Sequence, residues 1–221
     1  MYKVQNKVNF LPDNFNEIIS DKKICIIGCG GIGSILSEIL IRGGFNNLVL
    51  VDFDLINKSN LGRQNFLEKD IGKSKCLKLT DYLYLINPNI NIESFNTKLT
   101  KININEILED SDLIVDCTDN FESRNLINEY CEKNNKTWIY NGAIKAEVSS
   151  CIFNGKDKLF DKVFKNIENE KTYDVGVLSS TTFLAGSLAY NNICKYFLNI
   201  NENKLIKINL WNNKLFKVNL K

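Results

Sequence analysis

The chain has 221 residues, 44% hydrophobic and 24% charged, a composition typical of a globular protein with a buried core. Its 28 basic and 26 acidic side chains nearly cancel, so net charge gives no argument for a nucleic-acid or membrane surface. We find no signal peptide and no apolar run long enough to span a membrane. The seven cysteines predict free thiols in a reducing cytoplasm. The absence of histidine and of a Cys-x-x-Cys pair predicts that there is no zinc site.

Strand and helix patterns alternate through the first two thirds of the chain. Short β-branched runs predict strands, and apolar residues three and four positions apart predict helices. In chain order the predicted elements are strand Lys23–Gly28, helix Ile32–Arg42, strand Asn47–Asp52, helix Asp70–Leu85, strand Ile90–Phe95, helix Ile104–Leu108, strand Leu113–Cys117, helix Ser123–Lys133 and strand Thr137–Asn141. This alternation predicts right-handed βαβ units, and therefore a Rossmann-like, doubly wound α/β fold with a mainly parallel sheet.

The last third of the chain has a different pattern. Glu147–Phe153 predicts a strand, the polar and lysine-rich segment Lys156–Tyr173 a mobile crossover loop, and the apolar segment Val177–Leu198 a long helix. Lys204–Leu210 and Lys214–Leu220 alternate charged and apolar residues and predict a hairpin. We therefore expect C-terminal antiparallel strands beside the parallel sheet.

A glycine-rich turn follows the first predicted strand and opens the first predicted helix. It contains Gly28, Gly30, Gly31 and Gly33. Glycines permit a tight turn and a close approach of backbone to phosphate, and the helix N-terminus supplies N–H groups and partial positive charge. The turn predicts nucleotide binding, without distinguishing ATP from NAD. The alternative is a tight strand-to-helix turn without a ligand.

Asp52 stands at the end of the second predicted strand, 24 residues after Gly28. A carboxylate at this place accepts hydrogen bonds from ribose hydroxyls in dinucleotide-binding folds, so Asp52 is a candidate ribose ligand. NAD-dependent enzymes share this feature. The alternative is an aspartate that only caps the end of the strand.

The segment Ser59-Asn60-Leu61-Gly62-Arg63-Gln64 favours an ATP site over an NAD site, because it contains Arg63. A planar guanidinium binds phosphate oxygens bidentately, which a nucleotidyl-transfer site needs and a hydride-transfer site does not. Lys75, near the start of a predicted helix, is a second candidate phosphate ligand. The alternative for Lys75 is a solvated surface lysine.

Asp116-Cys117-Thr118-Asp119-Asn120 lies at the carboxyl end of the fourth predicted strand, where doubly wound sheets bind ligands. Asp119 is the candidate Mg²⁺ ligand, because Mg²⁺ takes oxygen ligands and bridges to phosphates. The alternative is that Asp119 caps the following helix, with Glu122 three residues later.

Several segments, taken together, resemble the ThiF/MoeB/HesA family of adenylating, ubiquitin-activating-enzyme-like proteins. They are GCGGIGS, LVDFD, SNLGRQ, IGKSK, LINPNI, DCTDN, NGAIKAE and AGSLAYNNICKY, between about residues 20 and 200. The resemblance implies a single adenylation domain over residues 1–221, with a nucleotide-binding core at about 20–145 and a C-terminal sheet extension and long helix at about 146–221.

The resemblance also implies a reaction and its residues. The enzyme would be an adenylyltransferase that uses ATP and Mg²⁺ to convert the C-terminal glycine carboxylate of a small ubiquitin-like sulfur carrier, ending in Gly-Gly, into an acyl adenylate. Arg63 and Lys75 would stabilise phosphate charge and Asp119 would hold Mg²⁺. The implied ATP ligands are Gly31, Asp52, Ser59, Asn60, Arg63, Lys75, Asp119 and Asn120. The resemblance further implies a role in thiamine, molybdopterin or related biosynthesis, a homodimer and a cytoplasmic location.

The chain departs from the family pattern in three places. It lacks the paired zinc cysteines; Tyr173 and Asp174 stand where many relatives have a cysteine; and residues 1–22 contain no arginine-rich helix. Cys151, on a predicted strand, is an alternative thiol, although a buried structural cysteine is the commoner case. Three other interpretations remain: a non-catalytic nucleotide-binding relative, an NAD-dependent oxidoreductase, and a relative that acts on modified tRNA.

Overall fold

The computed structural model describes residues 8, 10–164, 175–200 and 202–220. Its strands are β1 (Lys23–Ile27), β2 (Asn47–Val51), β3 (Asn91–Phe95), β4 (Leu113–Asp116), β5 (Thr137–Ile144), β6 (Glu147–Asn154), β7 (Lys204–Asn209) and β8 (Lys214–Asn219). Its α-helices are α1 (Phe15–Ile19), α2 (Gly31–Arg42), α3 (Lys75–Ile86), α4 (Ile104–Leu108), α5 (Phe121–Asn134), α6 (Leu159–Phe164) and α7 (Ser179–Phe197).

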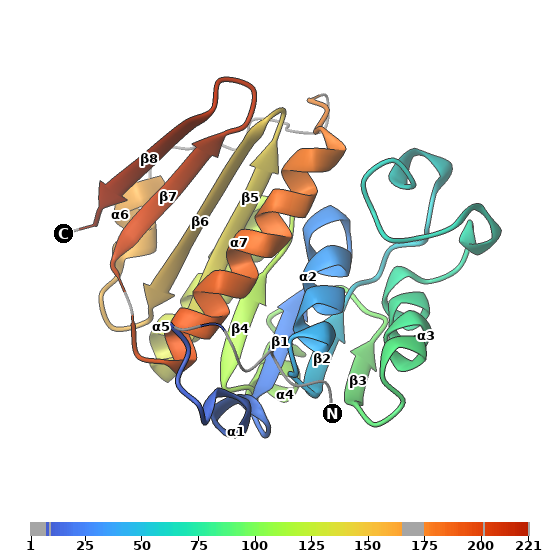
Figure 1. Cartoon of the computed structure of the whole chain (residues 1–221), viewed down its shortest axis with the longest axis horizontal. Coiled ribbons are helices and arrows are strands. Elements are labelled where there is room, and N and C mark those ends of the chain that lie inside the picture. Colours follow the sequence, from blue (N-terminus) through green and yellow to red (C-terminus); the bar gives the residue numbers. More distant parts are fainter. Residues whose placement is uncertain (1–7, 9, 165–174, 201, 221) are drawn as a thin grey trace.

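The strands form one sheet in the order β3-β2-β1-β4-β5-β6-β7-β8 (Figure 1). Neighbouring strands from β3 to β5 are parallel, and β6, β7 and β8 continue the sheet antiparallel. The predicted Rossmann-like sheet with C-terminal antiparallel strands is therefore confirmed. Strand order reverses between β1 and β4, and this reversal opens the crevice beyond the carboxyl ends of those strands.

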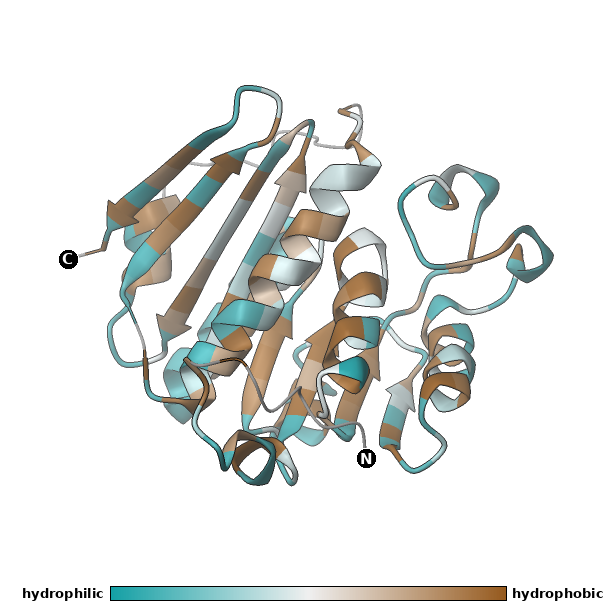
Figure 2. Ribbon diagram, in the orientation of Figure 1, coloured by the Kyte–Doolittle hydropathy of each residue, from teal (hydrophilic) through white to brown (hydrophobic). Residues whose placement is uncertain are grey.

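The two faces of the sheet carry separate apolar cores, because successive strand residues point to opposite sides. Ile24 and Ile26 of β1 pack on the face covered by α2, α3 and α7. Cys25 and Ile27 pack on the face covered by α4, α5 and α6. Figure 1 shows this three-layer arrangement, and Figure 2 shows that β1, β2 and β4 between the layers are mostly hydrophobic.

The predicted helix over Asp70–Leu85 starts later than expected. Asp70 ends a short 3₁₀ turn, and α3 begins at Lys75 after its N-cap Ser74, whose hydroxyl accepts a hydrogen bond from the Leu77 amide. Gly72 separates the two because its φ of 85° is incompatible with a right-handed helix.

The prediction of a loop over Lys156–Tyr173 is wrong for the residues that form α6. Leu159 and Phe160 are buried, and the Phe160 ring centroid lies 5.1 Å from that of Trp138. Aromatic packing against β5 therefore stabilises a short helix inside the segment that was predicted to be a loop. Residues 165–174, including Tyr173 and Asp174, lie outside the described residues.

Two further predictions concern the C-terminal third. The hairpin is confirmed, since β7 and β8 pair antiparallel around Leu210–Asn213. The long helix begins at Ser179, two residues after the predicted start. No helix among the described residues combines the length and apolar character needed to cross a bilayer.

Candidate active site

The glycine turn joins β1 to α2 at the point where strand order reverses. Gly28 has a φ of 95°, and a Cβ atom there would lie 2.8 Å from the Cys117 carbonyl oxygen that follows β4. A Cβ atom on Gly33 would lie 1.9 Å from the Gly28 carbonyl oxygen. These two glycines are required by the packing of the turn itself, independently of any ligand.

Gly31 and Gly30 differ from that pair. A Cβ atom on Gly31 would lie 2.8 Å from Cγ2 of Thr182 in α7, so this glycine permits α7 to approach. At Gly30 the nearest atom would be Nε2 of Gln64 at 3.6 Å, an ordinary contact. Gly30 is the N-cap of α2 and has no side chain to bond the first helical amides, which leaves them for an anion.

Asp52 follows β2 and is buried against the glycine turn. Its Oδ2 accepts a hydrogen bond of 2.7 Å from the Cys29 amide, and its Oδ1 accepts one of 2.8 Å from the Asp54 amide. Burial raises the pKa of the carboxyl, although these backbone hydrogen bonds oppose the effect. Asp52 thus joins β2 to the turn, as the capping alternative expected, and its ribose role stays a prediction.

The segment that carries Arg63 packs directly on the glycine turn. The Arg63 carbonyl oxygen would lie 3.2 Å from a Cβ on Gly31, and it accepts a 3.2 Å hydrogen bond from Oγ1 of Thr182. Arg63 as a whole is half-buried, and Nη1 of its guanidinium donates an exposed hydrogen bond of 2.7 Å to the Ser59 carbonyl. Asn60 is buried, and its Oδ1 accepts from the Asn57 amide at 3.1 Å, which closes the turn that precedes Arg63.

Lys75 is the first residue of α3, and only 7% of it is exposed. Its Nζ lies 2.6 Å from Oδ2 of Asp54, whose amide donates to Asp52. The alternative of a solvated surface lysine is therefore wrong. The three residues form a continuous polar chain from α3 to the glycine turn.

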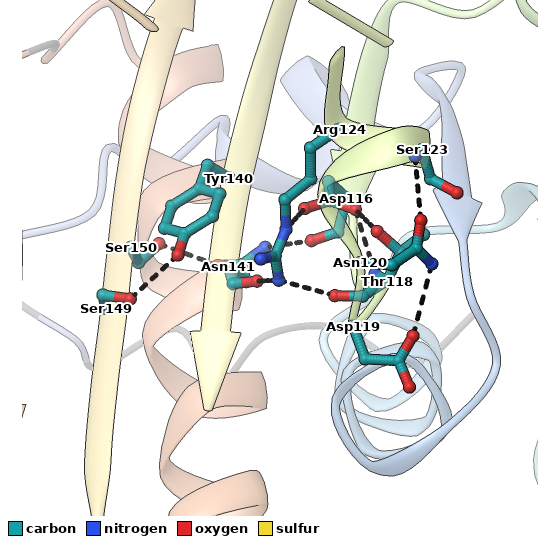
Figure 3. A network of polar contacts seen from close by, with 10 residues as sticks. All are labelled: Asp116, Thr118, Asp119, Asn120, Ser123, Arg124, Tyr140, Asn141, Ser149 and Ser150. Carbon is teal, nitrogen blue, oxygen red and sulfur yellow. Dashed lines mark hydrogen bonds and ion pairs between the residues drawn. The ribbon is translucent and has the colours of Figure 1, made fainter. Parts of the chain in front are cut away.

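Asp119 and Asn120 lie between β4 and α5 (Figure 3). Asn120, and not Asp119, is the N-cap of α5, because its Oδ1 accepts a 2.9 Å hydrogen bond from the Ser123 amide. Glu122 lies 3.1 Å from Lys98 instead of completing a box with Asp119. The capping alternative for Asp119 is thus wrong, and its exposed carboxylate accepts a 3.3 Å hydrogen bond from Nδ2 of Asn120.

Sequence reasoning missed the buried residues behind this loop. Asp116 and Arg124 form an ion pair with a 3.2 Å Nε–Oδ2 distance, and Asn141 of β5 donates to the Asp116 carbonyl at 3.0 Å. Burial raises the pKa of the Asp116 carboxyl, against the opposing effect of Arg124. The available signal was that Arg124 is one of only three arginines in the chain.

The cysteines are buried and unpaired in the structure. Cys151 on β6 is 1% exposed, and burial raises its pKa to about 12, so the thiol is protonated and enclosed. It is a structural residue, not a replacement thiol. Among the described residues, no group of three or more Cys, Asp and Glu side chains is placed to hold a metal ion.

The sheet order and the glycine turn at the β1–β4 crevice define a Rossmann-like α/β protein. The sequence model of the ThiF family matches residues 2–221, and the chain belongs to that family. The family resemblance inferred from the motifs is therefore confirmed.

Individual relatives agree with this assignment. The chain is 31% identical over 220 residues to "Ubiquitin-like modifier-activating enzyme 5" of Drosophila erecta, covering 89% of this chain and 54% of that protein. It is 36% identical over 191 residues to "Probable molybdopterin-synthase adenylyltransferase" of Porphyra purpurea, covering 82% of this chain and 50% of the relative. The chain thus spans about half the length of these curated relatives.

Solved structures share the fold. Escherichia coli MccB, crystallised with ATP, superposes with a TM-score of 0.78 at 23% identity over 93% of this chain and 66% of that chain. PaaA superposes with a TM-score of 0.79 at 19% identity over 96% of this chain and 68% of its own.

Proposed function

We propose that this protein is an adenylyltransferase that activates the C-terminal carboxylate of a small ubiquitin-like protein with ATP and Mg²⁺. One observation carries the proposal: the Arg63 segment packs on the glycine turn, its carbonyl oxygen 3.2 Å from a Cβ placed on Gly31. An arginine beside a phosphate-binding turn serves nucleotidyl transfer, whereas hydride transfer from NAD does not need one there.

The proposed reaction is attack of a carboxylate oxygen on the α-phosphorus of ATP, which forms the acyl adenylate and expels pyrophosphate. Both reactants are anions, so the site must orient them and offset their repulsion. Arg63 and Lys75 supply positive charge at the phosphates. Gly28, Gly30, Gly31 and Gly33 shape the turn that receives the nucleotide, and Asp52, Ser59 and Asn60 bind its remaining polar groups.

The residues at the carboxyl end of β4 fit a magnesium ion. Mg²⁺ in nucleotide sites takes one or two protein carboxylates and fills its other positions with phosphate oxygens and water. Asp119, with an exposed carboxylate and Asn120 beside it, provides that donor set. When bound, the ion neutralises charge on the phosphates.

The names of relatives support the substrate class. One relative is named for activating ubiquitin-like modifiers and another for adenylating molybdopterin synthase. We propose a sulfur carrier ending in Gly-Gly as the partner, in thiamine, molybdopterin or related biosynthesis. We further propose a homodimer in the cytoplasm, a compartment whose reducing conditions suit the seven unpaired thiols.

Exchange of radiolabelled pyrophosphate into ATP tests the proposal. Exchange should require Mg²⁺ and a ubiquitin-like protein with a Gly-Gly terminus. Arg63→Ala should lower it at least about 100-fold, the loss seen when one transition-state hydrogen-bond donor is removed. Arg42→Ala is the matched control, because Arg42 lies at the far end of α2 and pairs with Glu38. Equal rates in both variants, or tight NADH binding without ATP binding, would refute the proposed function.

A further inference from the structure

We infer that Arg124 is a positioning residue that sets the magnesium-binding carboxylate of Asp119 by fixing the loop between β4 and α5. This inference rests on the proposed function, because it concerns the metal ligand of the same site. The hydrogen bonds described for the Arg124 guanidinium go to Asp116, Thr118 and Asn141.

Arg124 is 7% exposed, and the described hydrogen bonds of its guanidinium go to β4, to the loop after it and to β5 (Figure 3). Nε lies 3.2 Å from Oδ2 of Asp116, and Nη2 donates to the Thr118 carbonyl at 2.7 Å and to the Asn141 carbonyl at 3.4 Å. A single planar group thus connects the last residue of β4, the loop and the neighbouring strand. A lysine ammonium has no planar fork with which to reproduce this set.

The bond to the Thr118 carbonyl acts directly on Asp119. The peptide unit between them is planar, so holding the Thr118 oxygen also fixes the Asp119 amide and the direction in which its Cα leaves the loop. Asp116 holds the preceding peptide unit, between Cys117 and Thr118, because its Oδ1 accepts from the Thr118 amide at 2.9 Å; the same oxygen also accepts from the Thr118 hydroxyl at 2.6 Å.

The guanidinium is itself held in place by its surroundings. Its Cζ atom lies 5.1 Å from the ring centroid of Phe121 and 4.9 Å from that of Tyr140. Asn141, whose carbonyl it bonds, accepts a 2.7 Å hydrogen bond from Ser150 of β6, which accepts one of 2.9 Å from Asn192 of α7. These hydrogen bonds therefore fix the Asp119 loop relative to the sheet and to α7.

A buried ion pair could serve stability without serving the site. The two roles separate experimentally, because a positioning role predicts a selective loss of metal affinity. Residues that orient metal ligands typically contribute about 10- to 100-fold to metal affinity. We therefore expect Arg124→Lys to weaken Mn²⁺ binding to the ATP-loaded protein at least about tenfold, while affinity for metal-free ATP changes less than about twofold.

The measurement is titration of the full chain with Mn²⁺ in the presence of ATP, with free Mn²⁺ followed by electron paramagnetic resonance. Thermal unfolding establishes that each variant is folded. Lys133→Arg, an exposed change at the other end of α5, is the control and should leave Mn²⁺ affinity unchanged. Should Arg124→Lys not fold, Thr118→Val, which removes the hydroxyl bonded to Asp116, takes its place with the same expected selectivity.

A double-mutant cycle tests whether the effect passes through Asp119. If it does, Arg124→Lys, or Thr118→Val in its place, causes no further loss of Mn²⁺ affinity in an Asp119→Asn background. Losses that add in full, unchanged Mn²⁺ affinity in the single variant, or an equal loss of metal-free ATP affinity would each overturn the inference. Wild-type protein that binds Mn²⁺ with ATP but shows no pyrophosphate exchange would instead refute the proposed function alone.

Discussion

The carbonyl oxygen of Gly28 lies 1.9 Å from the position that a Cβ atom on Gly33 would occupy. The first residue of the glycine turn therefore abuts the first turn of α2, with no room for a methyl group between them. Gly30 stands between the two in the sequence, and a Cβ there would meet only Nε2 of Gln64 at 3.6 Å.

This contrast predicts opposite consequences for two alanine substitutions. Gly33→Ala forces the turn and α2 apart and should destabilise the fold by more than about 2 kcal/mol, as overpacking of a rigid site does. Gly30→Ala should change unfolding by less than about 1 kcal/mol but weaken ATP binding, because it adds a methyl group at the N-cap of α2, whose first amides are proposed to receive the phosphates. Urea unfolding and nucleotide titration measure both; similar unfolding free energies for the two variants would contradict the prediction.

Lys75 and Asp54 should be coupled in stability. Lys75→Met removes a buried ammonium from an ion pair with a 2.6 Å separation, and its loss should cost about 1–3 kcal/mol, because hydrogen bonds to charged groups contribute that much. In an Asp54→Asn background the same substitution should cost clearly less. Denaturant unfolding of the four proteins gives the coupling energy. A coupling energy near zero would show that the pair does not stabilise the fold.

The raised pKa of Asp52 predicts a pH dependence of stability. The folded protein holds this proton at pH values where the unfolded chain, with a pKa of about 3.9, has released it. The unfolding free energy contributed by Asp52 is therefore greatest at low pH and falls as pH rises through the raised value. Asp52→Asn removes this contribution.

We expect the stability of the wild type relative to Asp52→Asn to decrease as pH rises from about 4 toward neutrality. Denaturant unfolding of both proteins at several pH values tests this. Asp116, whose pKa is raised in the same direction, is present in both proteins and cancels in the comparison. A difference that grows with pH would contradict the sign.

Thr182 links α7 to the Arg63 segment through the 3.2 Å hydrogen bond to the Arg63 carbonyl. The same hydroxyl also lies 2.9 Å from the Ser179 carbonyl of its own helix, so its one hydrogen is shared between the two acceptors. Thr182→Val preserves shape and removes both contacts, and should cost about 1 kcal/mol in unfolding free energy. We expect a larger effect on pyrophosphate exchange, because the bond holds the segment that carries the guanidinium. Ser187→Ala is the control, since its exposed hydroxyl bonds only within α7 to the Phe183 carbonyl at 3.0 Å. Equal exchange rates in the two variants would show that Thr182 does not contribute to the site.

The strands and most helices were predictable because local pattern and burial coincide in them. The alternation of Ile24 and Cys25 between the two cores follows from strand geometry alone. Two errors have separate causes: α6 is stabilised by contacts of Phe160 with Trp138 across the fold, whereas the delayed start of α3 depends on the local backbone conformation of Gly72. The division into one adenylation domain stays a prediction.

The sequence predicted which positions form the candidate site, but it did not predict which side chains contact one another there. Sequence order placed the glycine turn, Asp52 and Asp119 beyond neighbouring strands, because parallel strands end at the same edge. The burial of Lys75 depends on Asp54, and the Arg124 network joins residues of β4, α5 and β5 that no local pattern connects. The binding and catalytic roles of the named residues stay predictions.

Enclosure of every cysteine side chain gives the native protein a built-in reporter of local opening. Thiolates that reach solvent attack aromatic disulfide reagents such as Ellman's and release the aromatic thiolate. The folded chain should therefore react slowly, at a rate set by local opening of the fold rather than by collision with the reagent. Cys25 and Cys131 lie in one core and Cys29 and Cys76 in the other. The order in which these cysteines react would therefore reveal which face of the sheet opens first.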